Sequence, residues 1–207
     1  MAPREVRRLQ ASEARRLPWK NGRGVTREIA LGPDGAGFER GDFDWRVSAA
    51  RVEEPGPFSA FAGFDRTLVV TEGAGLILEH GEAAPRTRVR RMEPYRFSGD
   101  WPTRCELVAG AVADFNVLAR RGKWRAEVLA LELGRRVLRE SAGADVLVVH
   151  VLRGKLSVRV SGEEDPFDLE AGDSLQLAGL AAHDELECAG SSESCSVIVT
   201  RLRAEGR

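Results

Sequence analysis

The sequence has few of the residues that build the common catalytic and cross-linking sites. It holds three histidines, three cysteines and three lysines among 207 residues, and aromatic residues make up 6% of it. Three cysteines without redox or metal spacing argue against a disulfide framework, so we expect a reducing, cytoplasmic compartment. No run approaches the ~18 apolar residues of a membrane span, and the first residues contain no apolar signal core. We therefore expect no association with a membrane.

Neither sign of charge is in excess. The 31 basic and 32 acidic residues give a formal net charge of −1. Without a uniformly basic character, the chain lacks the electrostatic footprint of a nucleic-acid-binding protein, and we expect no such partner. The apolar content of 43% is sufficient for a hydrophobic core.

Short apolar stretches separated by glycine turns predict an all-β protein with an internal repeat. Residues 66–71, a turn at residues 72–75 and residues 76–78 read as strand, turn and strand, and residues 146–152, 153–155 and 156–160 repeat this pattern. Residues 94–100 correspond to residues 167–173 in this pattern, and residues 116–120 correspond to 197–201. The pattern is typical of the cupin, a double-sheet jelly roll. We predict two tandem cupins (jelly-roll β-barrels) in a bicupin, one over residues 1–121 and one over 122–207.

The histidines do not predict a metal site. First-row metals need three or four imidazole or carboxylate ligands. His183 falls where a cupin ligand could lie, but residues 141–147 supply no histidine or glutamate to join it, and His80 and His150 belong to other segments. We therefore predict no metal and no other cofactor. No motif for a serine or cysteine nucleophile is present either, so catalytic residues stay unknown.

Polar side chains occur at two-residue spacing on several predicted strands of the first half. Thr26 and Glu28 share one face of a strand, Arg46 shares a face with Ser48, and Asp114 shares a face with Asn116. Such pairs lie either in solvent or in a polar site inside the barrel.

One short segment before these strands combines an aromatic ring, a cation and an amide. Residues 17–24 read L-P-W-K-N-G-R-G, and Lys20 is one of three lysines in a chain that otherwise uses arginine. Because a flexible ammonium and a rigid guanidinium make different contacts, Lys20 is a candidate for a specific interaction.

The motifs of the first half resemble those of the HutD/Ves family. The similar segments are, in chain order, L-P-W-K-N-G (17–22), T-R-E-I-A (26–30), F-D-W-R-V-S (43–48), G-P-F-S (56–59), D-R (65–66), E-G-A-G (72–75), F-S-G-D (97–100) and D-F-N-V (114–117). Arg23 departs from the pattern, because the family usually has glycine there. The resemblance implies a metal-free two-cupin protein with a binding or regulatory role around histidine utilisation, and ligands such as urocanate or formylated glutamate.

Two functions are compatible with these residues. The first is binding of a small carboxylated metabolite in the first cupin, in a regulatory or accessory role. The alternative is a metal-independent enzyme, an isomerase or lyase acting on a small carboxylated substrate, so the sequence does not decide whether the protein is an enzyme. Sheet edges of the cupin type would also allow a homodimer.

The predicted ligand-binding residues have distinct tasks. Lys20 and Arg46 would bind the carboxylate, and Trp19 or Trp45 would form an apolar wall. Because buried charges must be paired, Lys20 or Arg46 should contact an acidic residue, Glu28 or Asp114. The remaining members of the predicted site would orient the ligand through hydrogen bonds: Asn21, Thr26 and Asn116.

Overall fold

The computed structural model describes residues 4–18, 24–141, 143–181 and 183–206. Throughout these ranges the regular structure consists of strands, with no helix, as the sequence predicts. Accordingly, this part of the chain contains no helix that is long and apolar enough to cross a membrane. Cys105, Cys188 and Cys195 are buried free thiols.

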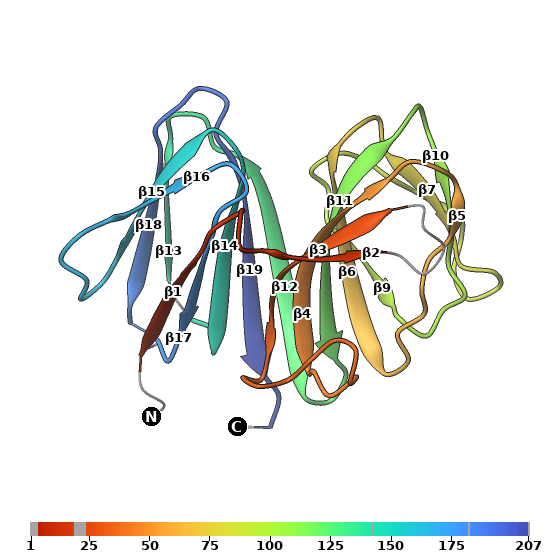
Figure 1. Ribbon diagram of the computed structural model, residues 1–207, viewed down its shortest axis with the longest axis horizontal. Coiled ribbons are helices and arrows are strands. Elements are labelled where there is room, and N and C mark those ends of the chain that lie inside the picture. Colours follow the sequence, from red (N-terminus) through yellow and green to blue (C-terminus); the bar gives the residue numbers. More distant parts are fainter. Residues whose placement is uncertain (1–3, 19–23, 142, 182, 207) are drawn as a thin grey trace. The chain divides into compact units, whose positions relative to one another are not determined.

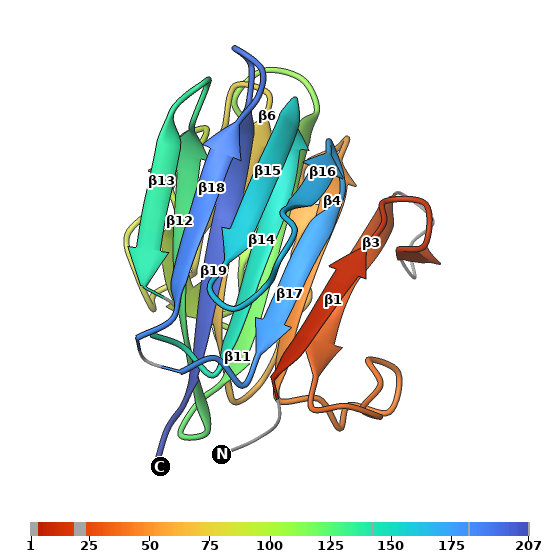
Figure 2. The ribbon, with the colours of Figure 1, turned by 90° about the vertical axis from the view of Figure 1, so that its left-hand side faces the viewer.

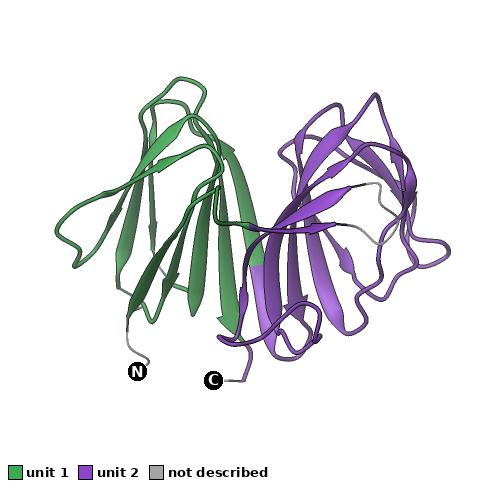
Figure 3. Ribbon diagram, in the orientation of Figure 1, with its two compact units in different colours: residues 1–14, 127–204 green, residues 15–126, 205–207 purple. Residues whose placement is uncertain are grey.

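The chain divides into two compact units, and each unit consists of two separate stretches of the sequence (Figure 3). Unit 2 comprises residues 15–126 and 205–207, and unit 1 comprises residues 1–14 and 127–204. We predicted one join near residue 122 and assigned the N-terminal residues to the first domain. The structure instead groups residues 1–14 with the second half, and the division between the units falls within one strand, β12 (Trp124–Glu132).

Unit 2 contains two antiparallel sheets (Figure 1). The six-stranded sheet has, in spatial order, β2 (Arg15–Pro18), β3 (Val25–Gly32), β4 (Trp45–Val52), β11 (Val112–Arg120), β6 (Phe64–Glu72) and β9 (Tyr95–Ser98). The four-stranded sheet has β5 (Gly56–Pro57), β10 (Arg104–Leu107), β7 (Leu76–Glu79) and β8 (Thr87–Val89).

Unit 1 also contains two sheets, shown from another side in Figure 2. The larger has β1 (Glu5–Leu9), β17 (Ser174–Ala178), β14 (Val146–Arg153), β19 (Ser196–Ala204) and β12. The smaller has β13 (Val137–Ser141), β18 (Glu185–Gly190), β15 (Lys155–Val160) and β16 (Phe167–Glu170). The pairing of β1 with β17 explains why the N-terminal residues belong to this unit.

Each unit has its own core between its two sheets. In unit 2, Leu68 and Val112 of the larger sheet pack in one cluster with Leu76 and Leu78 of the smaller. In unit 1, a corresponding cluster joins residues of β14, β17 and β19 to residues of β15, β16 and β18. Because side chains alternate along a strand, one face of each sheet supplies its unit's core.

The predicted strand–turn–strand repeat is present, but its two strands belong to different sheets. β6 lies in the six-stranded sheet of unit 2 and β7 in the four-stranded sheet, and β14 and β15 are divided in the same way. Gly73 in the first of these turns has a φ of 90°, and a Cβ there would lie 2.7 Å from the backbone oxygen of Ala111. A larger residue would therefore clash with the start of β11.

One predicted correspondence within the repeat is wrong. We aligned residues 94–100 with residues 167–173, which would make β9 the counterpart of β16. However, β9 pairs with β6, and its topological counterpart is β17, which pairs with β14. The short Gly-Asp sequence occurs in both halves because it suits tight turns, and it follows β9 but precedes β17. The correspondence of residues 116–120 with 197–201 is confirmed, because β11 and β19 occupy equivalent places beside β6 and β14.

Candidate functional site

The strand register of unit 2 gathers polar side chains on the core-facing side of the six-stranded sheet. Asn116 of β11 lies opposite Ser48 of β4 and Leu68 of β6, and Ser48 in turn lies opposite Glu28 of β3. Residues directly opposite one another share a face, so the polar residues lie on the same face as the core residue Leu68. The buried polar members of this face are Glu28, Arg46, Ser48, Arg66, Asp114 and Asn116.

Arg46 and Glu28 form a buried ion pair. Arg46 Nε donates to Glu28 Oε2 at 2.8 Å, and the two side chains are only 5% and 7% exposed. The guanidinium carbon lies 3.9 Å from the centre of the Phe38 ring, which adds a cation–π contact. Burial lowers the pKa of Arg46, and the hydrogen bond and charge of Glu28 oppose this effect. The predicted contact between a cation and Glu28 is therefore present.

Arg66, Asn116 and Asp114 form a second buried chain of contacts. Arg66 donates to Asn116 Oδ1 from Nε at 2.9 Å and from Nη2 at 2.6 Å. Asn116 Nδ2 then donates to Asp114 Oδ1 at 2.7 Å. The neutral amide thus separates the cation from the carboxylate, and Arg66 forms no ion pair within the part of the chain that the structure describes.

Burial disfavours the charged forms of both Arg66 and Asp114. It lowers the pKa of Arg66 to about 10, although the charge of Asp114 opposes the change. It also raises the pKa of Asp114 to about 6, against the charge of Arg66 and the hydrogen bond from Asn116. Both effects have the sign expected when loss of hydration outweighs the available counter-charge.

Phenylalanine rings surround the guanidinium of Arg66. Its central carbon lies 4.6 Å from the ring centre of Phe58, 5.5 Å from that of Phe97 and 5.9 Å from that of Phe61. We did not predict Arg66 as a site residue, although it lies in the D-R motif. The available signal was a charged residue in phase with Leu68 and Val70, which are core residues of the same strand.

The structure places the other predicted residues as follows. Thr26 is half-buried and lies opposite Ala50, on the same face as Glu28. Trp45 precedes Arg46, so it points to the opposite face of β4, where it makes an edge contact with Trp124 at 6.3 Å between ring centres. The prediction that Trp45 forms a wall of this site is therefore wrong. Three predicted residues lie outside the described part of the chain: Trp19, Lys20 and Asn21.

His80 and His150 lie within hydrogen-bonding distance of hydroxyl groups. His80 Nδ1 lies 2.9 Å from Thr103 Oγ1, and His80 Nε2 lies 3.2 Å from the hydroxyl of Tyr95. His150 Nδ1 lies 2.8 Å from Ser174 Oγ. Across the residues with described positions, no three histidine, cysteine or acidic side chains gather as they would around a metal ion.

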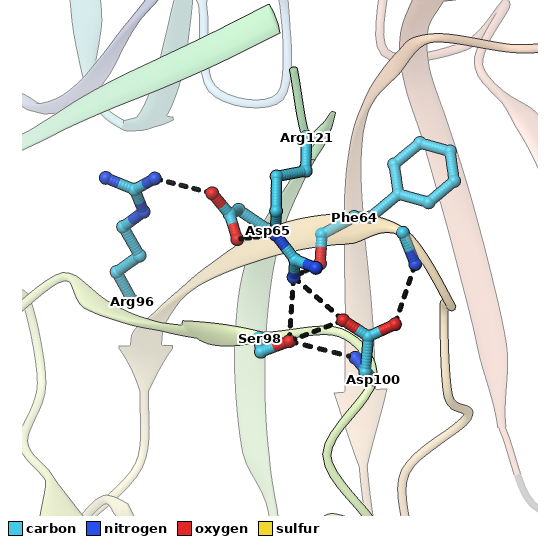
Figure 4. A network of polar contacts seen from close by, with 7 residues as sticks. Phe64, Asp65, Arg96, Ser98, Asp100 and Arg121 are labelled. Carbon is cyan, nitrogen blue, oxygen red and sulfur yellow. Dashed lines mark hydrogen bonds and ion pairs between the residues drawn. The ribbon is translucent and has the colours of Figure 1, made fainter. Parts of the chain in front are cut away.

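A second polar network, which we call the outer network, has partly exposed side chains and includes residues of the D-R and F-S-G-D motifs (Figure 4). Asp100 accepts hydrogen bonds from the Gly63 backbone at 2.8 Å, from Ser98 Oγ at 2.7 Å and from Arg121 Nη2 at 2.8 Å. Arg121 also pairs with Asp65, so it extends between two carboxylates. These hydrogen bonds lower the pKa of Asp100 well below its usual range.

A glycine completes this network. The φ of Gly99 is unexceptional, but a Cβ there would lie 2.5 Å from the backbone oxygen of Phe61 and 2.8 Å from that of Phe64. Gly99 also exchanges backbone hydrogen bonds with these two residues. The network therefore fixes the turn that carries Phe61 and leads into Arg66.

Comparison with solved structures identifies the fold as that of the cupins. Oxalate decarboxylase from Lactobacillus farciminis, in a formate complex, covers 94% of this chain and 85% of its own with a TM-score of 0.64 at 7% identity. The bacterial pirin YhhW from Escherichia coli gives a TM-score of 0.63 at 12% identity, covering 95% of this chain and 98% of its own. At such identities the likeness concerns the fold alone.

Closer relatives identify the family. A model of the HutD family matches residues 11–196, and the chain belongs to that family. HutD from Pseudomonas fluorescens SBW25 is 30% identical, with a TM-score of 0.79 over 98% of this chain and all of its own. An uncharacterized 21.2 kDa protein in the hutC 3' region of Pseudomonas putida is 31% identical over 83% of this chain and 90% of its own. Protein Ves of Cronobacter sakazakii is 33% identical over 70% of this chain and 77% of its own.

Proposed function

We propose that the core-facing polar cluster of unit 2 binds a small carboxylated metabolite without a metal. The observation that carries the proposal is Arg66, a buried cation that has no ion pair among the described residues. Keeping a buried guanidinium without a counter-charge in direct contact is costly, and a ligand carboxylate would supply that contact. The planar fork of arginine suits a carboxylate, which it can bind through two parallel hydrogen bonds.

The neighbouring groups support this assignment. Asn116 already occupies Nε and Nη2 of Arg66, and it orients the guanidinium through its own bond to Asp114. The rings of Phe58, Phe61 and Phe97 would provide an apolar surface beside a bound anion, as small-molecule sites commonly do. Arg46 is already neutralised by Glu28, so its charge would favour the ligand less than that of Arg66 does.

The family suggests which metabolites to test. One relative is described by its position in the hutC 3' region. We propose that the ligand is an intermediate of histidine degradation, resembling urocanate or formylglutamate, and that the protein has a regulatory or accessory role in the cytoplasm. In this proposal Trp19, Lys20, Asn21 and Thr26 add further ligand contacts, each unit is one cupin module, and a homodimer can form.

Calorimetric titration with urocanate and with formylglutamate tests the proposal. Arg66→Gln should weaken binding of the recognised ligand by about 100-fold, which corresponds to the loss of a buried charge-assisted contact worth about 3 kcal/mol. The matched control is Arg51→Gln on β4, because Arg51 is exposed and pairs only with Glu53 in the described structure. Equal affinity in Arg66→Gln and the unmodified protein would contradict the assignment.

A metal-independent enzyme is the second candidate, and Asp114 is the observation that favours it. A carboxyl group whose pKa is near 6 can accept and return a proton close to neutral pH. Product analysis after incubation with the ligand distinguishes the two functions. Conversion that is lost in Asp114→Asn would establish an enzyme, whereas binding without conversion supports the binding protein.

A further inference from the structure

The two cations and two carboxylates of the polar cluster balance in number, but only one of the two pairs is in direct contact. Glu28 and Arg46 neutralise each other through direct contact. Arg66 and Asp114 are the remaining pair, and the amide of Asn116 separates them. Asp114 is 2% exposed and the side chain that hydrogen-bonds to it in the described structure is the neutral Asn116, so its negative charge is stabilised mainly through Arg66 at a distance.

A ligand carboxylate at Arg66 would remove this support. Its oxygens would accept hydrogen bonds from the guanidinium N–H groups that Asn116 leaves free, and its negative charge would repel the Asp114 carboxylate in a poorly hydrated interior. Two anions would then share one cation, an arrangement in which one carboxyl group generally retains a proton. Addition of one proton to Asp114 keeps the total charge of the cluster unchanged.

We propose that a carboxylate ligand binds at Arg66 together with one proton, which Asp114 takes up from solvent. This inference rests on the proposed function, because it assumes that Arg66 is the anion-binding residue. It assigns Asp114 a role in specificity: Asp114 makes the site take up an anion and a proton together, and it sets the pH range in which the anion binds well.

The other groups around Asp114 do not offer the same coupling. Cys105 of β10 interacts electrostatically with Asp114, but burial raises the pKa of this thiol, so it stays neutral near pH 7. Glu28 accepts a hydrogen bond from Arg46, whose positive charge balances the charge of Glu28. The backbone of Ala50 on β4 hydrogen-bonds to Asp114 and does not titrate. Because Asp114 has a pKa of about 6, it is largely ionised at pH 7 and can accept the proton.

Sodium formate is the probe, because it presents a carboxylate without other recognition groups and stays ionised above about pH 5. Its dissociation constant should be measured by NMR titration at several values between about pH 6.5 and pH 8. If binding includes one proton, the affinity should fall by up to tenfold for each pH unit above the pKa of Asp114. In Asp114→Asn the affinity should not depend on pH, and in the control Glu53→Gln, an exposed carboxylate on the β4 side, the slope should be retained.

A second measurement uses the unmodified protein and does not depend on the folding of a variant. Calorimetry of formate binding at about pH 7 in phosphate and in Tris, two buffers with different ionisation enthalpies, gives the number of protons taken up, and we expect close to one. A pH-independent affinity, no proton uptake, or a pH slope that persists in Asp114→Asn would overturn the coupling while leaving the Arg66 site in place. If the folded protein binds no formate at any pH, both the coupling and the proposed anion site are overturned.

Discussion

The charge on Asp114 should lower the stability of unit 2 when no ligand is bound. Asp114 is buried, and its carboxyl group contacts the amide of Asn116 instead of a cation. Replacing it with asparagine keeps a carbonyl oxygen for the hydrogen bond from Asn116 but removes the negative charge. We therefore expect the Asp114→Asn variant to become more stable relative to the unmodified protein as the pH rises.

The size of this effect follows from the pKa of Asp114 in the folded protein. It is raised from 3.8 to about 6, chiefly by burial. The folded state thus binds the proton more tightly than the unfolded state, so the contribution is favourable at acid pH and is lost as the pH rises through the folded pKa. Since one pKa unit corresponds to about 1.4 kcal/mol, the ionised group costs about 3 kcal/mol at pH 8 and about half of that at pH 5.

Tryptophan fluorescence during urea unfolding measures this effect in the relevant unit. All four tryptophans lie between residues 15 and 126, so the signal reports on unit 2. Between pH 5 and pH 8, the stability of Asp114→Asn should rise by about 1.5 kcal/mol relative to the unmodified protein. A constant cost of the new amide cancels in this comparison, and Glu53→Gln should show no such change. A difference that does not vary with pH would refute the reasoning.

Two further predictions concern the outer network. Asp100→Asn should lower the melting temperature at neutral pH, because the hydrogen bonds from Gly63, Ser98 and Arg121 stabilise the ionised carboxylate. In calorimetric scans at pH values below about 4 this loss should shrink, because the stabilisation in the unmodified protein disappears as Asp100 is protonated. Gly99→Ala should destabilise unit 2 by about 1–3 kcal/mol in urea unfolding, because its Cβ would meet backbone oxygens. The control Gly56→Ala should be close to neutral, because a Cβ there meets nothing within 4 Å. Equal effects of the two substitutions would contradict the steric argument.

The parts of the site that could be predicted from the sequence are those that follow from the alternation of side chains along a single strand. A strand turns successive side chains to opposite faces, so the pairing of Arg46 with Ser48 and of Asp114 with Asn116 on common faces followed from their spacing. The register of β4 and β11 confirms that these two pairs lie on one face of the sheet. The contact of Arg46 with Glu28 could also be predicted, since a buried charge requires a partner.

Features that depend on strand order could not be predicted in this way. Arg66 reaches Asn116 because β6 is the neighbour of β11, whereas the two residues are fifty positions apart in the sequence. Likewise, β1 completes a sheet of unit 1 by pairing with β17 near the other end of the chain. Turn glycines and alternating strands do not specify which strands become neighbours, so they indicated the all-β class but not these pairings.

Adjacent residues of one motif serve two different purposes in the structure. Asp65 and Arg66 lie opposite Ser98 and Phe97 in the register of β6 and β9. Since neighbours on a strand face opposite ways, Asp65 joins the outer network with Arg121, while Arg66 and Phe97 meet inside. The outer contacts therefore fix the position of β6 against β9, and this position determines where the Arg66 guanidinium lies. A motif of this kind combines residues that hold the strand with residues that face the proposed ligand, and only the register of the sheet separates the two groups.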